Sequence, residues 1–137
     1  MDNLKLAEIL FPNLSLTVDD IEAKYPQRQL ASGAMVTRLA PSPTGFIHLG
    51  NLYGAYADMK LANQSGGVFY LRIEDTDEKR EVPGAVEEII NGLKYFGVDF
   101  DEGALIDGEK GAYGPYRQSA RKELYQVYAR ELVKKGL

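Results

Sequence analysis

A strand-like segment that runs directly into a tight turn and then into a helix constrains this chain most. Residues 34–40 are mostly apolar, and the turn at residues 41–45 contains two prolines and a glycine. Apolar side chains then recur with helical spacing over residues 48–63, at Leu49, Leu52, Tyr53 and Tyr56. In this arrangement, free backbone N–H groups and the positive end of the helix dipole face the turn, where they favour an anion. The segment predicts a phosphate site that is neither a P-loop nor a G-x-G-x-x-G turn.

The remaining segments continue this alternation of strand and helix. Residues 68–73 form an apolar run typical of a strand that is buried on both faces of a parallel sheet. We expect a helix from Pro83 to Gly97, a short strand at 98–100, a loop at 101–117 and a last helix at 118–135.

This order of elements predicts an α/β fold with a Rossmann-like, doubly wound parallel sheet. In such a sheet, ligands bind at the carboxyl ends of the strands. Residues 41–51 and 74–77 each follow a predicted strand, so both are candidates for the site.

Two domains are expected. Residues 1–33 are predicted to be a mainly helical N-terminal extension, with Thr17 capping a short helix that ends at Tyr25 before a proline. Residues 34–137 are predicted to be a partial Rossmann-type domain.

Composition limits the class of protein. A chain of 137 residues with 45% hydrophobic and 26% charged residues fits a globular domain with a workable core. The absence of cysteine excludes disulfides and Cys-based zinc sites. No apolar run reaches the roughly 20 residues of a membrane span, and no signal-peptide pattern opens the chain. These features predict a reducing, cytoplasmic setting and no membrane partner.

Charge is unevenly distributed along the chain. The net charge of −4 argues against a general nucleic-acid binder. Residues 74–109 hold twelve acidic and three basic residues, whereas residues 115–137 hold six basic and two acidic residues. The basic end has two interpretations, either a solvated helix face or an edge that meets nucleic-acid phosphates.

Three motifs in this order resemble the glutamyl-tRNA synthetases, a family of class I aminoacyl-tRNA synthetases. Residues 41–51, P-S-P-T-G-F-I-H-L-G-N, are similar to the first class I signature, H-I-G-H. Residues 71–77 read L-R-I-E-D-T-D, and residues 114–119 read G-P-Y-R-Q-S. Glutaminyl relatives usually carry P-P-E-P-N-G where residues 40–45 read A-P-S-P-T-G. The resemblance implies ATP-dependent activation of L-glutamate, with Mg²⁺, and transfer of the glutamyl group to the 3′ end of tRNA-Glu.

The resemblance also predicts that the chain is an N-terminal fragment of the catalytic domain. Whole members of the family are several times longer, and no K-M-S-K-S-like segment, the second signature of the class, occurs here. We therefore expect truncation before the acceptor-binding insertion, and a fragment that is not competent for catalysis alone.

The resemblance assigns the chemistry of phosphate transfer to the first motif. His48 is expected to contact the phosphate in the transition state, together with Gly50 and Asn51 as the catalytic motif. Asn51 departs from the second histidine of many members. The residues expected to bind ATP are Pro43, Thr44, Gly45, His48 and Gly50. The alternative for His48 is a ring that only caps or packs.

Amino-acid recognition is predicted around the end of the first strand. A planar guanidinium suits two-point contact with a carboxylate, so Arg38 is expected to bind the γ-carboxylate of glutamate. The alternative for Arg38 is an ion pair with one of the nearby acidic residues. Glu74 is expected to bind the α-ammonium, and Ala40 and Ser42 complete the glutamate site. A protein-bound metal is not expected, because Mg²⁺ usually arrives with the ATP phosphates.

Arg117 and Gln118 are candidates for contact with the tRNA acceptor end. The equally weighted alternative is a helix start at which Ser119 serves as the cap.

Three other functions compete with this assignment. One is the short paralogue that glutamylates a base of tRNA-Asp and carries similar motifs. Another is a folded nucleotide-binding module without turnover. The third is a nucleotidyltransferase of the H-x-G-H type, against which the R-I-E-D-T-D segment argues.

Overall fold

The computed structural model describes residues 2–137, which form two compact units. Gln29–Ser119 make up the first unit, and residues 2–28 together with Ala120–Leu137 make up the second. No helix of the described residues is long and apolar enough to cross a membrane.

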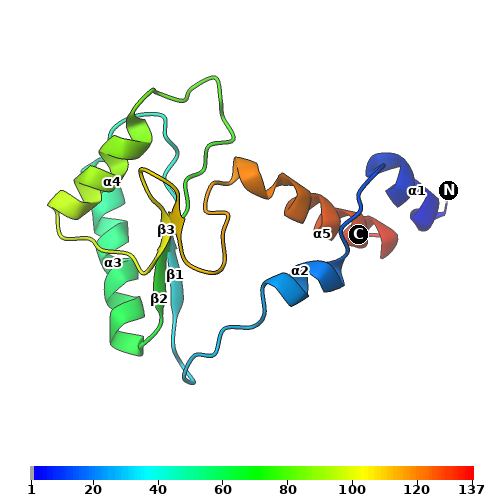
Figure 1. Cartoon of the computed structure of the whole chain (residues 1–137), viewed down its shortest axis with the longest axis horizontal. Coiled ribbons are helices and arrows are strands. Elements are labelled where there is room, and N and C mark those ends of the chain that lie inside the picture. The colour runs from blue at the N-terminus through cyan, green and yellow to red at the C-terminus, as the bar shows by residue number, and fades with distance from the viewer. Residues whose placement is uncertain (1) are drawn as a thin grey trace. The chain divides into compact units, whose positions relative to one another are not determined.

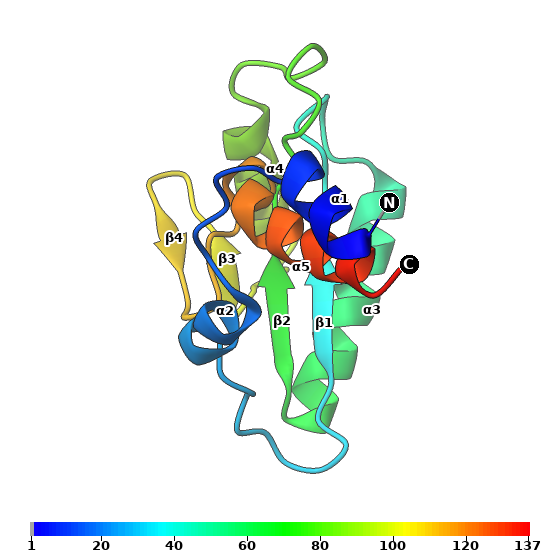
Figure 2. The ribbon, with the colours of Figure 1, turned by 90° about the vertical axis from the view of Figure 1, so that its right-hand side faces the viewer.

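The first unit is built on a four-stranded sheet (Figure 2). The strands are β1 (Val36–Leu39), β2 (Val68–Leu71), β3 (Glu102–Ala104) and β4 (Glu109–Lys110), and they lie in this order. The first three are parallel, and β4 pairs antiparallel with β3. The predicted α/β fold with a mostly parallel sheet is confirmed.

Two helices cover one face of this sheet. Figure 1 shows α3 (Leu49–Ser65) and α4 (Ala85–Tyr95) side by side on that face. Strand and helix side chains share one core that includes Leu39, Phe69, Leu71, Met59, Ile89 and Leu93. On β2, Phe69 and Leu71 are buried whereas Val68 and Tyr70 are half-buried. The expectation of a strand buried on both faces is therefore wrong, because both helices of this unit pack on the same face.

The third strand lies later than predicted. Residues 98–100 form no strand, and the predicted loop at 101–117 contains the β3–β4 hairpin. Gly103 allows β3 to pair with β2, because a Cβ at this position would lie 2.6 Å from the Leu71 carbonyl oxygen. Small residues have low strand propensity, so the sequence pattern concealed this strand.

The buried face of α3 also differs from the predicted stripe. Leu49 and Tyr53 are 81% and 79% exposed, whereas Ala55, Met59 and Ala62 are buried. The helix itself is confirmed, and it ends at Gly66, whose φ of 67° lies in the left-handed region that glycine favours. Helix α4 begins one residue after Gly84 rather than at Pro83, and its buried side chains are Ala85, Ile89, Ile90 and Leu93.

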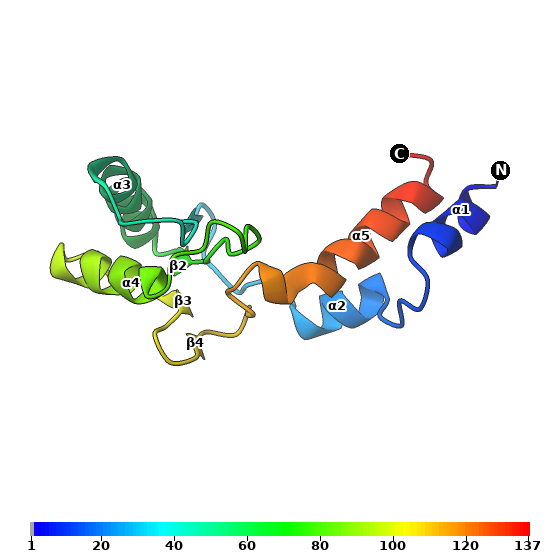
Figure 3. The same ribbon diagram turned by 90° about the horizontal axis from the view of Figure 1, so that it is seen from above.

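The second unit is helical. It contains α1 (Asn3–Leu10), α2 (Val18–Lys24) and α5 (Lys122–Lys134), the last preceded by a short 3-10 helix, η1 (Ser119–Arg121). Both α1 and α2 contact α5 (Figure 3). Thr17 caps α2 as predicted, in a reciprocal box with Asp20.

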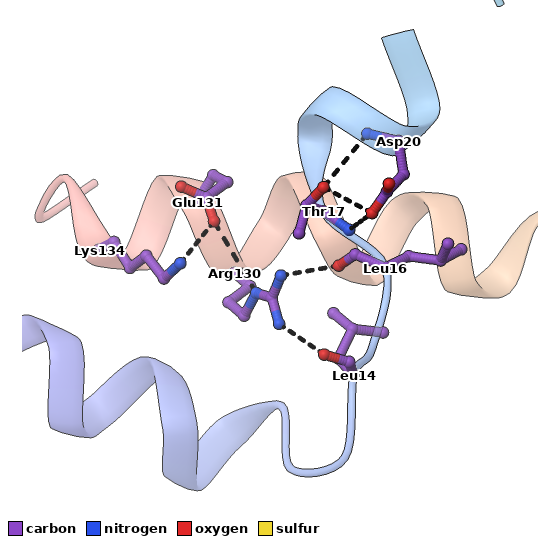
Figure 4. A network of polar contacts seen from close by, with 7 residues as sticks. All are labelled: Leu14, Leu16, Thr17, Asp20, Arg130, Glu131 and Lys134. Atoms are coloured by element: carbon purple, nitrogen blue, oxygen red, sulfur yellow. Dashed lines mark hydrogen bonds and ion pairs between the residues drawn. The ribbon is translucent and has the colours of Figure 1, made fainter. Parts of the chain in front are cut away.

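One arginine ties the segment between α1 and α2 to α5. Arg130 of α5 donates hydrogen bonds to the carbonyl oxygens of Leu14 at 2.9 Å and Leu16 at 2.8 Å (Figure 4). Lys134 pairs with Glu131 at 2.7 Å on the same helix. Arg130 is therefore held inside the unit, which favours a structural role for this basic side chain over phosphate binding.

Candidate functional site

The first two motifs meet at the carboxyl ends of β1 and β2. The Arg72 N–H donates to the Leu39 carbonyl at 3.0 Å, and the Glu74 N–H donates to the Pro41 carbonyl at 2.9 Å. These bonds continue the parallel ladder beyond both strands. Glu74 is therefore fixed opposite the turn that follows β1.

The third motif joins the same edge through β2. Ile73 forms a parallel bridge with Arg117, because its N–H donates to the Tyr116 carbonyl and its carbonyl accepts from the Gln118 N–H, both at 2.9 Å. Three segments that are distant in the sequence thus lie side by side around Glu74.

Asp75 secures this third contact from a buried position. Its carboxylate is 8% exposed and accepts from the Ser119 N–H at 2.9 Å and the Ser119 hydroxyl at 2.8 Å. Arg117 lies 3.9 Å away. Ser119 therefore donates to Asp75 instead of capping a helix, and the N-cap residue of α5 is Arg121, which makes no side-chain cap bond.

His48 begins α3 in a reciprocal capping arrangement. Its Nδ1 accepts from the Gly50 N–H at 3.2 Å, and its own N–H donates to the Asn51 side-chain oxygen at 3.2 Å. A ring that accepts at Nδ1 carries its proton on Nε2, so the available donor is Nε2. A Cβ on Gly50 would lie 3.1 Å from the imidazole, which explains why the smallest residue stands there.

A cleft of about 330 Å³ lies along the first motif. Its lining combines polar and apolar residues: Pro41, Ser42, Thr44, Gly45, Phe46, Ile47, His48, Asn51 and Ile89. Gly45 has open space around its Cα, so a ligand can approach its backbone. Its φ is not positive, so this turn does not require a glycine for its backbone conformation. Pro43 is fully buried, and its carbonyl accepts from the Val82 N–H.

Arg38 and Glu74 form an ion pair beside this turn. The Arg38 Nη1 lies 2.6 Å from the Glu74 Oε1, and the Arg72 Nη2 lies 3.0 Å from the same oxygen. Burial raises the pKa of the Glu74 carboxyl, but hydrogen bonds from Arg72 and Arg38 outweigh it and hold that pKa below its usual value. The site therefore presents a carboxylate and two guanidiniums in mutual contact.

The Asp58 carboxyl group also lies within the electrostatic influence of Arg38. Burial raises the pKa of Asp58 on α3, and the positive charge of Arg38 opposes this rise. Ala40, the remaining residue predicted to contact glutamate, is half-buried. Between residues 2 and 137, no group of three or more histidine, aspartate or glutamate side chains is placed to hold a metal ion.

Sequence reasoning missed Arg72 as a member of this cluster. The signal was present, because residues two apart on a strand project from the same face. Arg72 and Glu74 have this spacing, and Arg38 pairs in register with Tyr70, two residues before Arg72.

Parallel strands whose carboxyl ends carry a helix-capping histidine turn and an ion pair are typical of α/β domains that bind ligands at this edge of the sheet. Residues 34–137 match the family described as tRNA synthetases class I (E and Q), catalytic domain. The chain belongs to this family.

Individual relatives agree with this assignment. The chain is 61% identical to a glutamate–tRNA ligase of Acetivibrio thermocellus, over 99% of this chain and 25% of that protein. It is 51% identical to a glutamate–tRNA ligase of Clostridium perfringens strain 13, over 96% of this chain and 24% of that protein. The chain thus spans about a quarter of the length of these curated relatives.

Solved structures give the same result. A glutamate–tRNA synthetase of Elizabethkingia anophelis superposes with a TM-score of 0.68 and 44% identity, over 74% of this chain and 20% of that one. A glutamate tRNA ligase of Elizabethkingia meningosepticum, solved in complex with its amino acid, superposes with a TM-score of 0.67 and 44% identity, over 73% of this chain and 19% of that one.

Proposed function

We propose that this chain supplies the first part of the catalytic domain of a glutamate–tRNA ligase. The observation that carries the proposal is the Arg38–Glu74 pair at the strand ends, which offers opposite charges to the two ends of an amino acid. The 61% identity to a named glutamate–tRNA ligase supports the choice of substrate.

In this proposal, glutamate is held by charge and shape. The Arg38 guanidinium contacts the γ-carboxylate, and the Glu74 carboxylate contacts the α-ammonium. Ser42 and the backbone near Ala40 line the same side. An arginine at the γ position distinguishes glutamate from glutamine, because an uncharged amide cannot form the ion pair.

Activation is a phosphoryl substitution that needs little acid–base chemistry. An oxygen of the glutamate α-carboxylate attacks the α-phosphorus of ATP, and pyrophosphate leaves with the electron pair of the broken P–O bond. The transition state gathers negative charge on the phosphate oxygens. In this proposal the His48 Nε2–H and the backbone N–H groups of Thr44 and Gly45 stabilise that charge, and Pro43 and Gly50 shape the ATP site around them.

Transfer follows from the adenylate. A ribose hydroxyl of the terminal adenosine of tRNA-Glu attacks the activated carbonyl carbon, and AMP leaves. Arg117 and Gln118 are the candidates in this chain for contact with the acceptor end. Mg²⁺ enters with the ATP phosphates in this scheme, and no residue here is assigned to it. A reaction that uses tRNA and ATP in translation also places the protein in the cytoplasm.

The test is a chimera in which this chain replaces the matched first quarter of the Acetivibrio thermocellus enzyme. With tRNA-Glu present, we expect glutamate-dependent pyrophosphate exchange and aminoacylation. A folded chimera that forms no glutamyl-adenylate, or that charges tRNA with glutamine, would contradict the proposal.

Arg38→Ala in the chimera tests the assigned specificity. We expect the KM for glutamate to rise by about 10- to 100-fold, since a charge-assisted contact is lost, while the KM for ATP stays near its original value. Equal increases in both KM values would show that Arg38 supports the fold rather than the substrate.

A further inference from the structure

The Glu74 carboxylate has two cationic partners, and only one of them has a role in the proposed reaction. Arg38 and Arg72 donate to the same oxygen, Oε1, at 2.6 Å and 3.0 Å. Register on the sheet explains this convergence. Arg38 pairs with Tyr70 across the ladder, and Arg72 and Glu74 follow at two-residue steps, so all three charged side chains lie on one face of the sheet. Figure 2 shows the two strands, β1 and β2, side by side.

Arg72 is the more firmly held of the two arginines. Its side chain is 18% exposed, compared with 35% for Arg38, and its backbone N–H is fixed to Leu39. Its Nε is buried without a hydrogen-bond partner. A buried donor without a hydrogen-bond partner destabilises a fold, so burying Arg72 has a cost. The hydrogen bond from its Nη2 to Glu74 is the contact that offsets this cost.

We propose that Arg72 is a positioning residue for glutamate, and that the free site is a closed ion triad whose pairing is exchanged when the amino acid binds. This inference rests on the proposed function. In the free protein, the Glu74 carboxylate pairs with Arg38 in the place of the substrate carboxylate. In the same way, the Arg38 guanidinium pairs with Glu74 in the place of the substrate ammonium.

The exchange requires a partner that stays in place. When the substrate γ-carboxylate takes Arg38, Glu74 loses one of its two donors. Arg72 remains bound to Oε1, keeps the carboxylate ionised and oriented, and leaves its other lone pairs for the α-ammonium. Because both arginines donate to Oε1, Arg72 also weakens the ion pair between Glu74 and Arg38. Arg38 can then exchange Glu74 for the substrate carboxylate more easily.

The first readout is the ionisation of Glu74 in the free 137-residue chain. Carboxyl-detected NMR titration would compare the original chain with Arg72→Gln, Arg72→Lys and Arg80→Gln. Arg80 is the matched control, because it bonds Asp77 in the same segment but is 75% exposed. We expect Arg72→Gln to raise the pKa of Glu74, Arg72→Lys to restore most of the original value, and Arg80→Gln to change nothing.

The second readout is affinity. Calorimetry would measure the binding of a non-hydrolysable glutamyl-adenylate analogue and of the same analogue without its glutamyl group. We expect Arg72→Gln to weaken the glutamyl analogue by roughly tenfold or more, and to leave the shorter analogue unchanged, because only the amino-acid end meets the triad. Arg72→Lys, which keeps the positive charge, should recover most of the affinity. Its recovery would show that the effect of Arg72→Gln does not come from unfolding.

The outcomes separate this inference from the proposed function. If the original chain binds the glutamyl analogue and Arg72→Gln binds it equally well, the inference is overturned and the proposed function stands. If Arg72→Gln leaves the pKa of Glu74 unchanged, the triad is overturned regardless of ligand. If the original chain prefers the shorter analogue, both the proposed glutamate site and the role of Arg72 are wrong.

Discussion

At the scale of single residues, His48 makes a structural contact that is compatible with its proposed contact to phosphate. Its Nδ1 accepts the Gly50 N–H, which orients the ring and directs the proton to Nε2. The capping role considered as the alternative for this histidine is therefore present in the structure. It is compatible with phosphate contact, because the two roles use different ring nitrogens.

The chemical role of His48 can be separated from the capping role. In the chimera, His48→Ala should lower kcat for adenylate formation by about 100-fold, as the loss of a single charge-stabilising donor does. The KM for ATP should change little, because the contact strengthens mainly in the transition state. Pyrophosphate exchange would measure both constants.

Asn51→Ala measures how much the cap by itself contributes. It removes the reciprocal bond to the His48 N–H and should cost about 1 kcal/mol of stability, while the imidazole stays in place. If both variants lose activity to the same extent, His48 acts through the helix and not through the phosphate.

The ion triad makes stability depend on pH in a defined direction. The pKa of Glu74 is lowered in the folded chain, so the stability it contributes is present above its ordinary value of 4.5 and is lost as pH falls through the folded value. The free energy of unfolding of the original chain should therefore exceed that of Glu74→Gln at neutral pH. Urea titrations from pH 7 to pH 3 should show this difference shrinking on acidification.

Asp58 provides a comparison of opposite sign. Its raised pKa means that its ionisation disfavours the folded state, so its contribution is lost as pH rises through the folded value. Asp58→Asn should remove this penalty, and its gain over the original chain should grow from acid to neutral pH. The same direction of change in both variants would contradict the assigned shifts.

At the scale of elements, the site depends on backbone bonds beyond the ends of regular strands. Ladder bonds from Arg72 and Glu74 extend the β1–β2 pairing, and Ile73 adds the segment around Arg117. Asp75 then closes this arrangement by accepting both donors of Ser119. The two acidic residues of the second motif therefore have different contacts. Glu74 pairs with Arg38 at the candidate site, whereas Asp75 holds Ser119 and so stabilises the fold.

Asp75→Ala should destabilise the chain by about 2–3 kcal/mol. The substitution leaves the Ser119 N–H without its acceptor and removes the buried charge beside Arg117. Chemical denaturation would measure the change. Ser119→Ala is the matched control, since it removes only the hydroxyl bond and should cost about 1 kcal/mol. An Asp75→Ala variant as stable as the original chain would show that the contact between Asp75 and Ser119 does not stabilise the fold.

At the scale of the whole molecule, burial is distributed unequally between the two units. The first unit holds a continuous core from strands and helices, including Phe69, Leu71 and Leu93. In the second unit the buried apolar side chains are Ala7, Ile21 and Val127 among the described residues. Few buried contacts mean low local stability.

Native-state hydrogen exchange should therefore distinguish the units. We expect the amides of α5 to exchange faster than those of β2, through openings that leave the sheet intact. Val127→Ala should speed exchange in α1 and α5 only, whereas Leu93→Ala, its counterpart in the larger core, should affect β2 and α4. Equal protection of α5 and β2 in the original chain would show that the chain opens as a single unit.

Much of the first unit could be predicted because its signals are local. The apolar runs, the turn prolines and the glycine after α3 each act through the backbone of a few residues, and they located β1, β2, α3 and α4. Strand β3 was missed because its residues are small and polar, and its position depends on the approach of Gly103 to Leu71. The roles of the predicted site residues stay predictions, although Arg38 and Glu74 do lie together.

The sequence by itself determined the alternation of elements, the resemblance in three motifs, and hence the edge of the sheet at which a site belongs. Local backbone geometry sets the periods of helices and strands, so these features are readable without a fold. Only the tertiary structure decided that α3 buries its alanines instead of Leu49 and Tyr53, that Arg72 shares Glu74 with Arg38, and that Asp75 holds Ser119. These outcomes depend on which segments, distant in the sequence, come into contact in the fold. Such contacts produce no periodic pattern of residues from which they could be predicted.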